Sequence, residues 1–195
     1  IRNCDWSSDV CSSDLPFNIL QFNNASSKLG FRIGRQNLSQ VHNSLSKSHA
    51  TFEKGLGYKG YSNTLPSIRI QSYSEFNQFG TIHDAWLEFA SNQKLYNIFV
   101  EWTENGSTFR QLKTMCDKEY GNAITKSIGF ITEFKYFFSE TEITLVRDII
   151  GPSDQHIVSL SYTYLPLKEG VRSAKHSILE KIKKKMPWET ATYFG

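Results

Sequence analysis

The sequence predicts an α+β fold in which one antiparallel sheet, built from hairpins in a meander, carries two or three helices on one face. Segments with the two-residue alternation of strands outnumber segments with helical periodicity. Most strand segments are separated by connections too short for a parallel crossover. Fourteen Phe and nine Tyr against five Pro are typical of a sheet-rich chain. Together these observations favour α+β.

The amino-terminal residues are set apart from this prediction because they show no hydrophobic period. Residues 5–15, DWSSDVCSSDL, resemble the codon-by-codon translation of a common sequencing adapter. We therefore expect residues 1–15 to be a disordered, non-native segment, against the alternative of a natural Ser/Asp-rich arm. The rest of the chain is expected to form a single domain over residues 16–186 and a tail over residues 187–195.

Excluding residues 1–15 changes the cysteine and charge counts. Cys4 and Cys11 belong to that segment, so Cys116 is the only cysteine left and cannot form an internal disulfide. The formal charge of +3 for the whole chain is alone too small to indicate nucleic-acid binding, and without residues 1–15 the remaining 21 basic and 16 acidic residues give +5.

The first third of the domain predicts three strands and a helix. Residues 29–35 are expected to form a short strand bounded by two glycines. Asn37 suits the N-cap of a helix that ends near Lys47, with Gln40 as the other half of a capping box. Residues 49–61 are expected to form a strand that breaks into a Gly-rich turn, and residues 67–73 a further strand, followed by a loop over residues 76–81.

Residues 82–121 carry the most consistent signals and are expected to anchor the core. A polar turn separates two strands, and a helix that begins after Asn105-Gly106-Ser107 ends at Gly121. Each large apolar side chain buried by this unit is worth ~1.5–3 kcal/mol. The residues assigned to its apolar faces are His83, Ala85, Leu87 and Phe89; Tyr96, Ile98, Val100 and Trp102; Phe109, Leu112, Cys116 and Tyr120.

The last third predicts three strands and a basic helix. The strands are expected over residues 128–138, 142–149 and 156–164, joined as an antiparallel meander. The helix begins at Pro166 and ends before Pro187. Its apolar stripe consists of Val171, Ala174, Ile178 and Ile182.

Three stretches resemble bacterial envelope domains of the SmpA/OmlA (BamE-like) type: GFRIGRQNLSQVHNSL, a hairpin ending in QKLYNIFVEW, and a helix ending in KEYG. The resemblance covers residues 29–121. It implies helices packed on a small antiparallel sheet, an architecture shared with β-lactamase inhibitory proteins. It also implies an exported, non-catalytic protein that binds or scaffolds another envelope protein.

No residue pattern predicts a catalytic, cofactor-binding or metal-binding site. Cys116 lies on an apolar helical stripe, which is typical of a core cysteine rather than of a reactive thiolate. The glycines and lysines of residues 54–60 are better explained as a hairpin tip than as a phosphate loop. Five histidines lack metal-ligand spacing: His42, His49, His83, His156 and His176.

The basic end of the last helix is the candidate contact surface. Its lysines are interpreted either as a solvated helix end that favours the dipole, or as a contact for an anionic partner. The residues are Lys181, Lys183, Lys184 and Lys185, together with Trp188.

The resemblance implies a periplasmic or outer-membrane-associated protein that acts by protein–protein binding, and no residue pattern predicts a cofactor. Two alternatives stay open. One is a small hydrolase-like enzyme whose residues are scattered along the chain. The other is binding of an anionic lipid surface or nucleic acid through the basic helix, of which nucleic acid is the less favoured.

Overall fold

The structure is a computed structural model of the chain, and it describes residues 29–55, 65–149 and 156–185. The predicted segments 1–15 and 187–195 lie outside these residues. The described helices are α1 (Leu38–Lys47), α2 (Ser74–Asn77), α3 (Thr108–Tyr120) and α4 (Leu165–Lys185). The strands are β1 (Thr51–Gly55), β2 (Ser67–Ser72), β3 (Ile82–Phe89), β4 (Leu95–Thr103), β5 (Ile124–Ile128), β6 (Ile131–Phe138), β7 (Thr141–Asp148) and β8 (Ile157–Tyr164).

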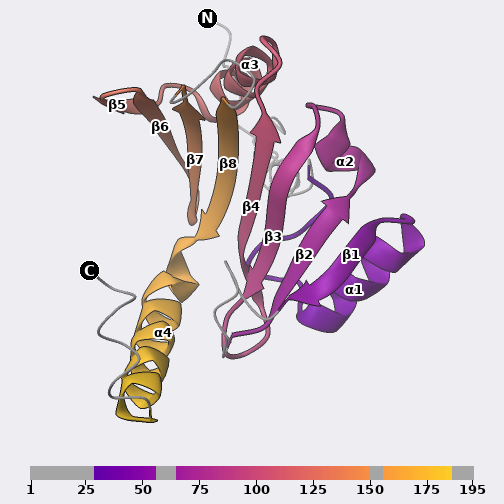
Figure 1. Cartoon of the computed structure of the whole chain (residues 1–195), viewed down its shortest axis with the longest axis vertical. Coiled ribbons are helices and arrows are strands. Elements are labelled where there is room, and N and C mark those ends of the chain that lie inside the picture. Colours follow the sequence, from indigo (N-terminus) through magenta and orange to yellow (C-terminus); the bar gives the residue numbers. More distant parts are fainter. Residues whose placement is uncertain (1–28, 56–64, 150–155, 186–195) are drawn as a thin grey trace, which may run out of the picture.

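The predicted α+β fold with a single antiparallel sheet is confirmed. The eight strands have the order β1-β2-β3-β4-β8-β7-β6-β5, and every neighbouring pair is antiparallel (Figure 1). Strands β1 to β4 form one meander. Helix α3 then carries the chain to the far edge, from which β5 to β8 return to pair with β4. The sheet is therefore two meanders joined at its centre.

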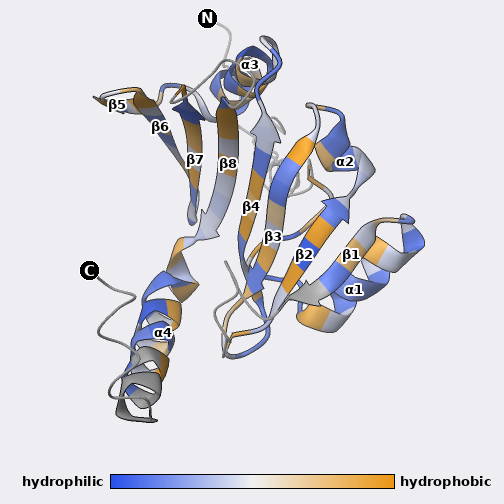
Figure 2. Ribbon diagram, viewed as in Figure 1, coloured by the Kyte–Doolittle hydropathy of each residue, from blue (hydrophilic) through white to orange (hydrophobic). Residues whose placement is uncertain are grey.

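The main core lies between one face of this sheet and helices α1, α2 and α3. Apolar and polar residues alternate along β2, β3 and β4 (Figure 2), so one face of each strand is apolar. Helix α1 contributes Val41 and Leu45 to the core, and α3 contributes Leu112 and Cys116. Trp102 is fully buried, and its indole Nε1 donates a hydrogen bond to the Phe76 carbonyl oxygen of α2, 2.9 Å away. Three helices therefore share the face that forms the core.

The hairpin of β3 and β4 confirms most of the predicted faces, with two corrections. Ala85, Leu87 and Phe89 on β3, and Ile98, Val100 and Trp102 on β4, belong to the main core. His83 is exposed instead, because the register shifts between Ile82 and Asp84. Tyr96 belongs to a second cluster, because a further shift between Glu88 and Phe89 turns it away from the core.

The predicted helix over residues 38–47 is confirmed with its cap, whereas the predicted strand over residues 29–35 is wrong. The Asn37 side chain accepts from the Gln40 N–H, and the Gln40 side chain accepts from the Asn37 N–H. Residues 29–35 bury alternate side chains as a strand would. However, Gly30 and Gly34 have positive φ, so the segment turns and does not join the sheet.

Two other boundaries differ from the sequence prediction. The expected strand over residues 128–138 is interrupted at Gly129 and Phe130, which form a tight turn between β5 and β6. Strand β5 was missed because all five of its residues are exposed, so it has no alternation of apolar and polar positions. The expected loop over residues 76–81 begins inside the short helix α2.

Helix α4 does not join the main core. Its Val171 is buried in the second cluster with Leu65, Ala90 and Tyr96, on the other side of the sheet from α1, α2 and α3. The rest of α4 extends beyond the end of β8 (Figure 1). The first turns of α4 therefore pack on the sheet separately from the main core.

Among the described helices, none combines the length and apolar character needed to cross a membrane.

Replacing Gly34 with alanine tests the turn that precedes α1. Gly34 has a φ of 73°, and a Cβ there would lie 2.8 Å from ring atoms of Tyr164, whose hydroxyl is held by Glu140. We expect Gly34→Ala to lower the free energy of unfolding by ~2–4 kcal/mol, from backbone strain plus overpacking. Gly106→Ala is the matched control, because its φ is 86° and a Cβ there meets no atom within 4 Å. If urea denaturation shows that both variants lose the same free energy of unfolding, the contact with Tyr164 adds no cost at Gly34, which would contradict this account.

Candidate functional site: the groove beneath helix α4

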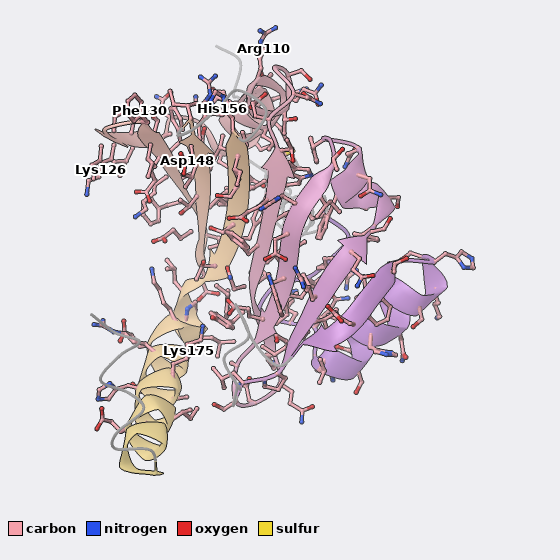
Figure 3. The ribbon with its side chains drawn as sticks, viewed as in Figure 1. Arg110, Lys126, Phe130, Asp148, His156 and Lys175 are labelled. Carbon is pink, nitrogen blue, oxygen red and sulfur yellow. The ribbon has the colours of Figure 1, made fainter. Side chains whose placement is uncertain are left out.

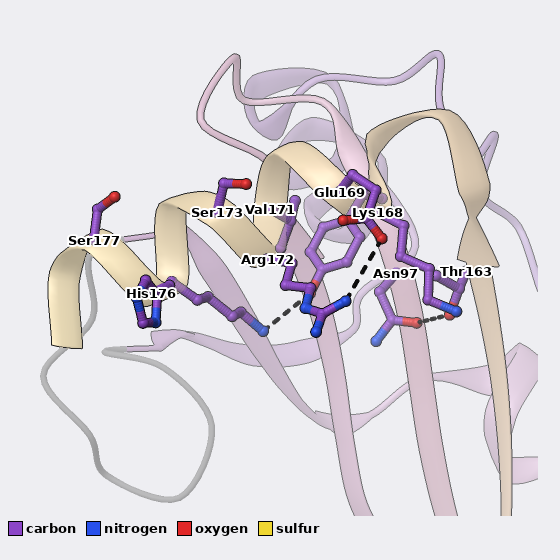
Figure 4. A pocket seen from close by; sticks show the side chains of 11 residues that line it. Asn97, Thr163, Lys168, Glu169, Val171, Arg172, Ser173, His176 and Ser177 are labelled. Atoms are coloured by element: carbon purple, nitrogen blue, oxygen red, sulfur yellow. Dashed lines mark hydrogen bonds and ion pairs between the residues drawn. The ribbon is translucent and has the colours of Figure 1, made fainter. Parts of the chain in front are cut away.

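A groove of about 880 Å³ runs between the first turns of α4 and the ends of β4 and β8 (Figure 4). Its floor comes from the sheet and its wall from the helix. The chain reaches this position directly, because α4 begins at Leu165, one residue after β8 ends. The lining residues are Tyr96, Asn97, Thr163, Lys168, Glu169, Val171, Arg172, Ser173, Lys175, His176 and Ser177.

The groove exists because β4 contains an irregularity. Phe89 pairs with Leu95, but Glu88 pairs with Asn97, so Tyr96 is the extra residue. Tyr96 can then lie on the same side of the sheet as Glu88 and Asn97. Its ring packs with Val171 of α4 and is 6% exposed. One extra residue in β4 thus creates the apolar seat of the helix.

The carboxylate of Glu88 joins three elements at this seat. Its Oε2 accepts hydrogen bonds from the Tyr96 hydroxyl at 2.9 Å and from the Asn97 Nδ2 at 2.8 Å. Its Oε1 lies 3.2 Å from the Lys175 Nζ of α4. The Thr163 hydroxyl of β8 donates to the Asn97 Oδ1 at 3.1 Å and extends the network. Charge-assisted hydrogen bonds of this kind fix the position of α4 on the sheet.

Tyr96 remains protonated in this setting. Burial raises the pKa of its phenol, and the neighbouring Glu88 carboxylate raises the pKa further by its charge and by the hydrogen bond it accepts. The Lys175 Nζ lies 3.1 Å from the phenol oxygen and 5.7 Å from the ring centroid. Tyr96 is therefore a hydrogen-bond donor that stabilises the seat and not a group that exchanges protons at neutral pH.

The wall of the groove is cationic, and its cations differ in how firmly they are paired. Lys175 is held by Glu88, and Lys168 lies 3.3 Å from Glu142. The Arg172 guanidinium lies 4.0 Å from Glu169, and both side chains are about 80% exposed (81% and 79%). An exposed pair at this distance contributes little stability. Arg172 is thus readily available to an external anion, and the serine hydroxyls beside it can donate further hydrogen bonds.

The contact residues predicted from sequence continue the same helix. The helical backbone of α4 extends to Lys185, so Lys181, Lys183, Lys184 and Lys185 all belong to it. Their side chains, and all of Trp188, lie outside the described part of the structure. Of the predicted apolar stripe, Val171 is buried and Ala174 packs against the second cluster.

The other candidate residues do not assemble at this groove, apart from His176. His42 lines a cavity of about 340 Å³ beneath α1, while His49, His83 and His156 line neither cavity. Figure 3 shows His156 far from Lys175. No group of three potential metal ligands occurs within the described residues. Cys116 is fully buried in the main core.

Sequence patterns alone missed Glu88, Tyr96, Asn97 and Lys175. Tyr96 was assigned to the core face because simple alternation from Trp102 leads there. A bulge leaves no mark in such a pattern unless a glycine or proline indicates it, and residues 94–98 contain neither. From sequence alone, Glu88 on β3 and Asn97 on β4 were therefore indistinguishable from ordinary polar positions.

Comparison with known proteins gives one distant structural likeness. No family model matches the chain, and no curated protein matches it. The chain is similar to the crystal structure of a DUF4309 family protein (YjgB) from Bacillus subtilis subsp. subtilis str. 168. The likeness covers 73% of this chain and 92% of that chain, with 15% sequence identity and a TM-score of 0.42. A likeness of this degree supports no inference about function.

Removing the Glu88 carboxylate tests the seat of α4. We expect Glu88→Ala to lower the free energy of unfolding by ~1.5–3 kcal/mol, because three donors lose a charged acceptor. Amide exchange in residues 168–176 should quicken more than exchange in α1. Glu169→Ala, which removes the exposed acid near Arg172, should change stability by less than ~0.5 kcal/mol. Unchanged exchange in α4 of the Glu88→Ala variant would contradict the assigned role.

The thiol of Cys116 should be inert in the folded protein. Burial raises its pKa from 9.0 to about 12, with Asp117 adding to the rise and Lys113 opposing it. Stability that depends on the protonated thiol is present below pH 9 and is lost as the pH rises towards 12. In a Cys4→Ser/Cys11→Ser variant at pH 8, we expect slow labelling by a disulfide reagent in buffer and fast labelling in urea. Rapid labelling of the native variant would contradict the core assignment.

Proposed function

We propose that the protein is a non-catalytic binding protein that holds an acidic segment of another protein along α4. The charge of this helix carries the proposal. Its 21 residues contain seven of the 22 Lys and Arg residues of the chain but only two of the 19 Asp and Glu residues. Outside α4 and residues 1–15, the chain has 14 basic residues (21 − 7) and 14 acidic residues (16 − 2), so its net positive charge is concentrated on one element.

The geometry of the seat supports this proposal. Glu88 and Lys175 hold the first turns of α4 in place, and the remainder extends away from the sheet (Figure 1). A helix fixed at one end presents its cations without first having to be ordered, which lowers the entropic cost of binding. Arg172 and the groove beside it extend the cationic surface onto the sheet.

A polypeptide suits this surface better than a small anion does. The groove is open, and the backbone of α4 continues beyond it to Lys185, so a contact along this helix would be spread over several turns. The groove also offers amide and hydroxyl groups, Asn97, Thr163 and Ser173 among them, which can bind a peptide backbone as well as carboxylates. We propose an envelope protein as the partner, in a periplasmic or outer-membrane-associated setting, and this part rests on the sequence resemblance.

Binding to poly-L-glutamate tests the charge dependence of α4. We expect the full chain to bind this probe, with an affinity that falls at least ~10-fold between 50 and 200 mM salt. Replacing Lys183, Lys184 and Lys185 with glutamine should weaken binding strongly. The matched control replaces Lys47, Lys94 and Lys118, which are exposed lysines outside α4, with glutamine. Both triple variants lose the same net charge. Fluorescence anisotropy of labelled poly-L-glutamate should therefore distinguish the loss of cations on α4 from the loss of positive charge in general.

The following outcomes would each contradict a part of the proposal. Binding that does not depend on salt, or that both triple variants weaken equally, would exclude α4 as the contact surface. Tighter binding to phosphatidylglycerol vesicles or to duplex DNA than to poly-L-glutamate would identify a different class of partner. Recovery of the native protein from the cytoplasmic fraction of its host would contradict the proposed compartment.

A further inference from the structure

Strand β5 leaves an unusually exposed apolar edge on the sheet. All five of its residues are exposed, and Ile124 and Ile128 are 66% and 65% exposed. Phe130, in the following turn, is 64% exposed. Figure 3 places Lys126 and Phe130 at a corner of the molecule remote from Lys175 on α4. Native proteins usually protect edge strands from pairing with other chains, so an apolar edge of this kind indicates an interaction surface.

The backbone of β5 has hydrogen-bonding groups available for another strand. Gly129, with a φ of 57°, and Phe130 form a two-residue turn, so Ile128 and Ile131 are the hydrogen-bonded pair next to it. Alternate residues of β5 then face β6. The N–H and C=O groups of Thr125 and Ser127 point instead away from β6, to the edge that no other described strand pairs with. These four groups are the ones an additional strand requires.

The side chains of β5 give this edge a pattern. Opposed residues of an antiparallel pair share a face, so Ile124, Lys126 and Ile128 lie on the face of Lys135, Glu133 and Ile131. Thr125 and Ser127 lie on the other face, with Phe134 and Thr132. One face therefore presents an apolar, a cationic and an apolar position in order, while the other presents two small hydroxyl residues.

The charge of Lys126 specifies what should lie opposite it. Its cross-strand neighbour Glu133 is already paired with Lys135, whose Nζ lies 3.2 Å from the Glu133 Oε1. Among the described residues, Lys126 itself makes no ion pair. An acidic side chain on an added strand would lie beside Lys126, and apolar side chains two residues away on each side would cover Ile124 and Ile128.

We propose that β5 binds an extended segment of a partner protein as an added strand, with the pattern apolar–polar–acidic–polar–apolar. Backbone hydrogen bonds to Thr125 and Ser127 supply affinity, and the side chains on the Ile124 face supply specificity. A second copy of this chain fits less well. Symmetric antiparallel pairing of two β5 strands over their full length would place Lys126 opposite Lys126 of the other copy, and like charges directly opposite are destabilising.

This proposal does not depend on the proposed function of α4. The edge is formed by β5 and its turn, and α4 contributes to neither. Loss of binding at α4 would leave the β5 proposal intact. An α4 variant with three neutralised lysines should accordingly retain binding of a strand peptide.

The test uses two peptides of nine residues with the central sequences VTETV and VTKTV, added to the full chain. We expect the glutamate peptide to bind about three- to tenfold more tightly than the lysine peptide. The order should reverse for the Lys126→Glu variant. Amide exchange followed by NMR should show protection of Thr125 and Ser127 when the glutamate peptide is bound.

A pair of substitutions separates strand addition from non-specific apolar binding. Thr125→Pro removes an outward N–H at an edge position where proline is tolerated, so the fold should persist while peptide binding is lost. Thr125→Val keeps that N–H and should keep binding. Equal affinity for both peptides, or unchanged binding by the Thr125→Pro variant, would overturn the proposal. Protection of Thr125 and Ser127 that rises with protein concentration and without peptide would assign the edge to a second copy, which also overturns it.

Discussion

The pairing of β4 with β8 is the constraint on which the rest of the structure depends. Seven residue pairs, from Asn97 with Thr163 to Thr103 with Ile157, join two meanders that would otherwise be separate four-stranded sheets. Val100 and Leu160 oppose each other in the middle of this junction, and both are fully buried. The central pairing is non-local, with residues about 60 positions apart, so its loop-closure cost has to be offset by this burial.

The junction also places the two surfaces to which we assign binding. Because β8 lies next to β4, α4 starts beside the irregular segment of β4 and its Lys175 reaches Glu88. Because α3 carries the chain from β4 across to the outer edge, β5 becomes an edge strand whose five residues are all exposed. The same topology thus separates a cationic helix from an apolar edge, and each surface can be tested without the other.

The sequence predicted local elements well and their irregularities poorly. The capping box of Asn37 and Gln40, and the alternation from Ile98 to Trp102, are signals contained within a few residues, and the structure confirms both. Strand β5 has no buried residue, so periodicity could not identify it. The displacement of Tyr96 depends on a register shift against Glu88, which only the paired strand reveals. The groove was missed for that reason, whereas the basic residues of α4 were found from composition.

The central claim is that α4, seated on the sheet through Glu88, is the element that binds an acidic partner. Hydrogen exchange measured by mass spectrometry, with and without poly-L-glutamate, tests this claim most directly. The account predicts added protection in residues 168–185 and in the segment around Tyr96, with no change in α1. Protection confined to α1 or to the β1–β2 edge, with α4 unaffected, would contradict it.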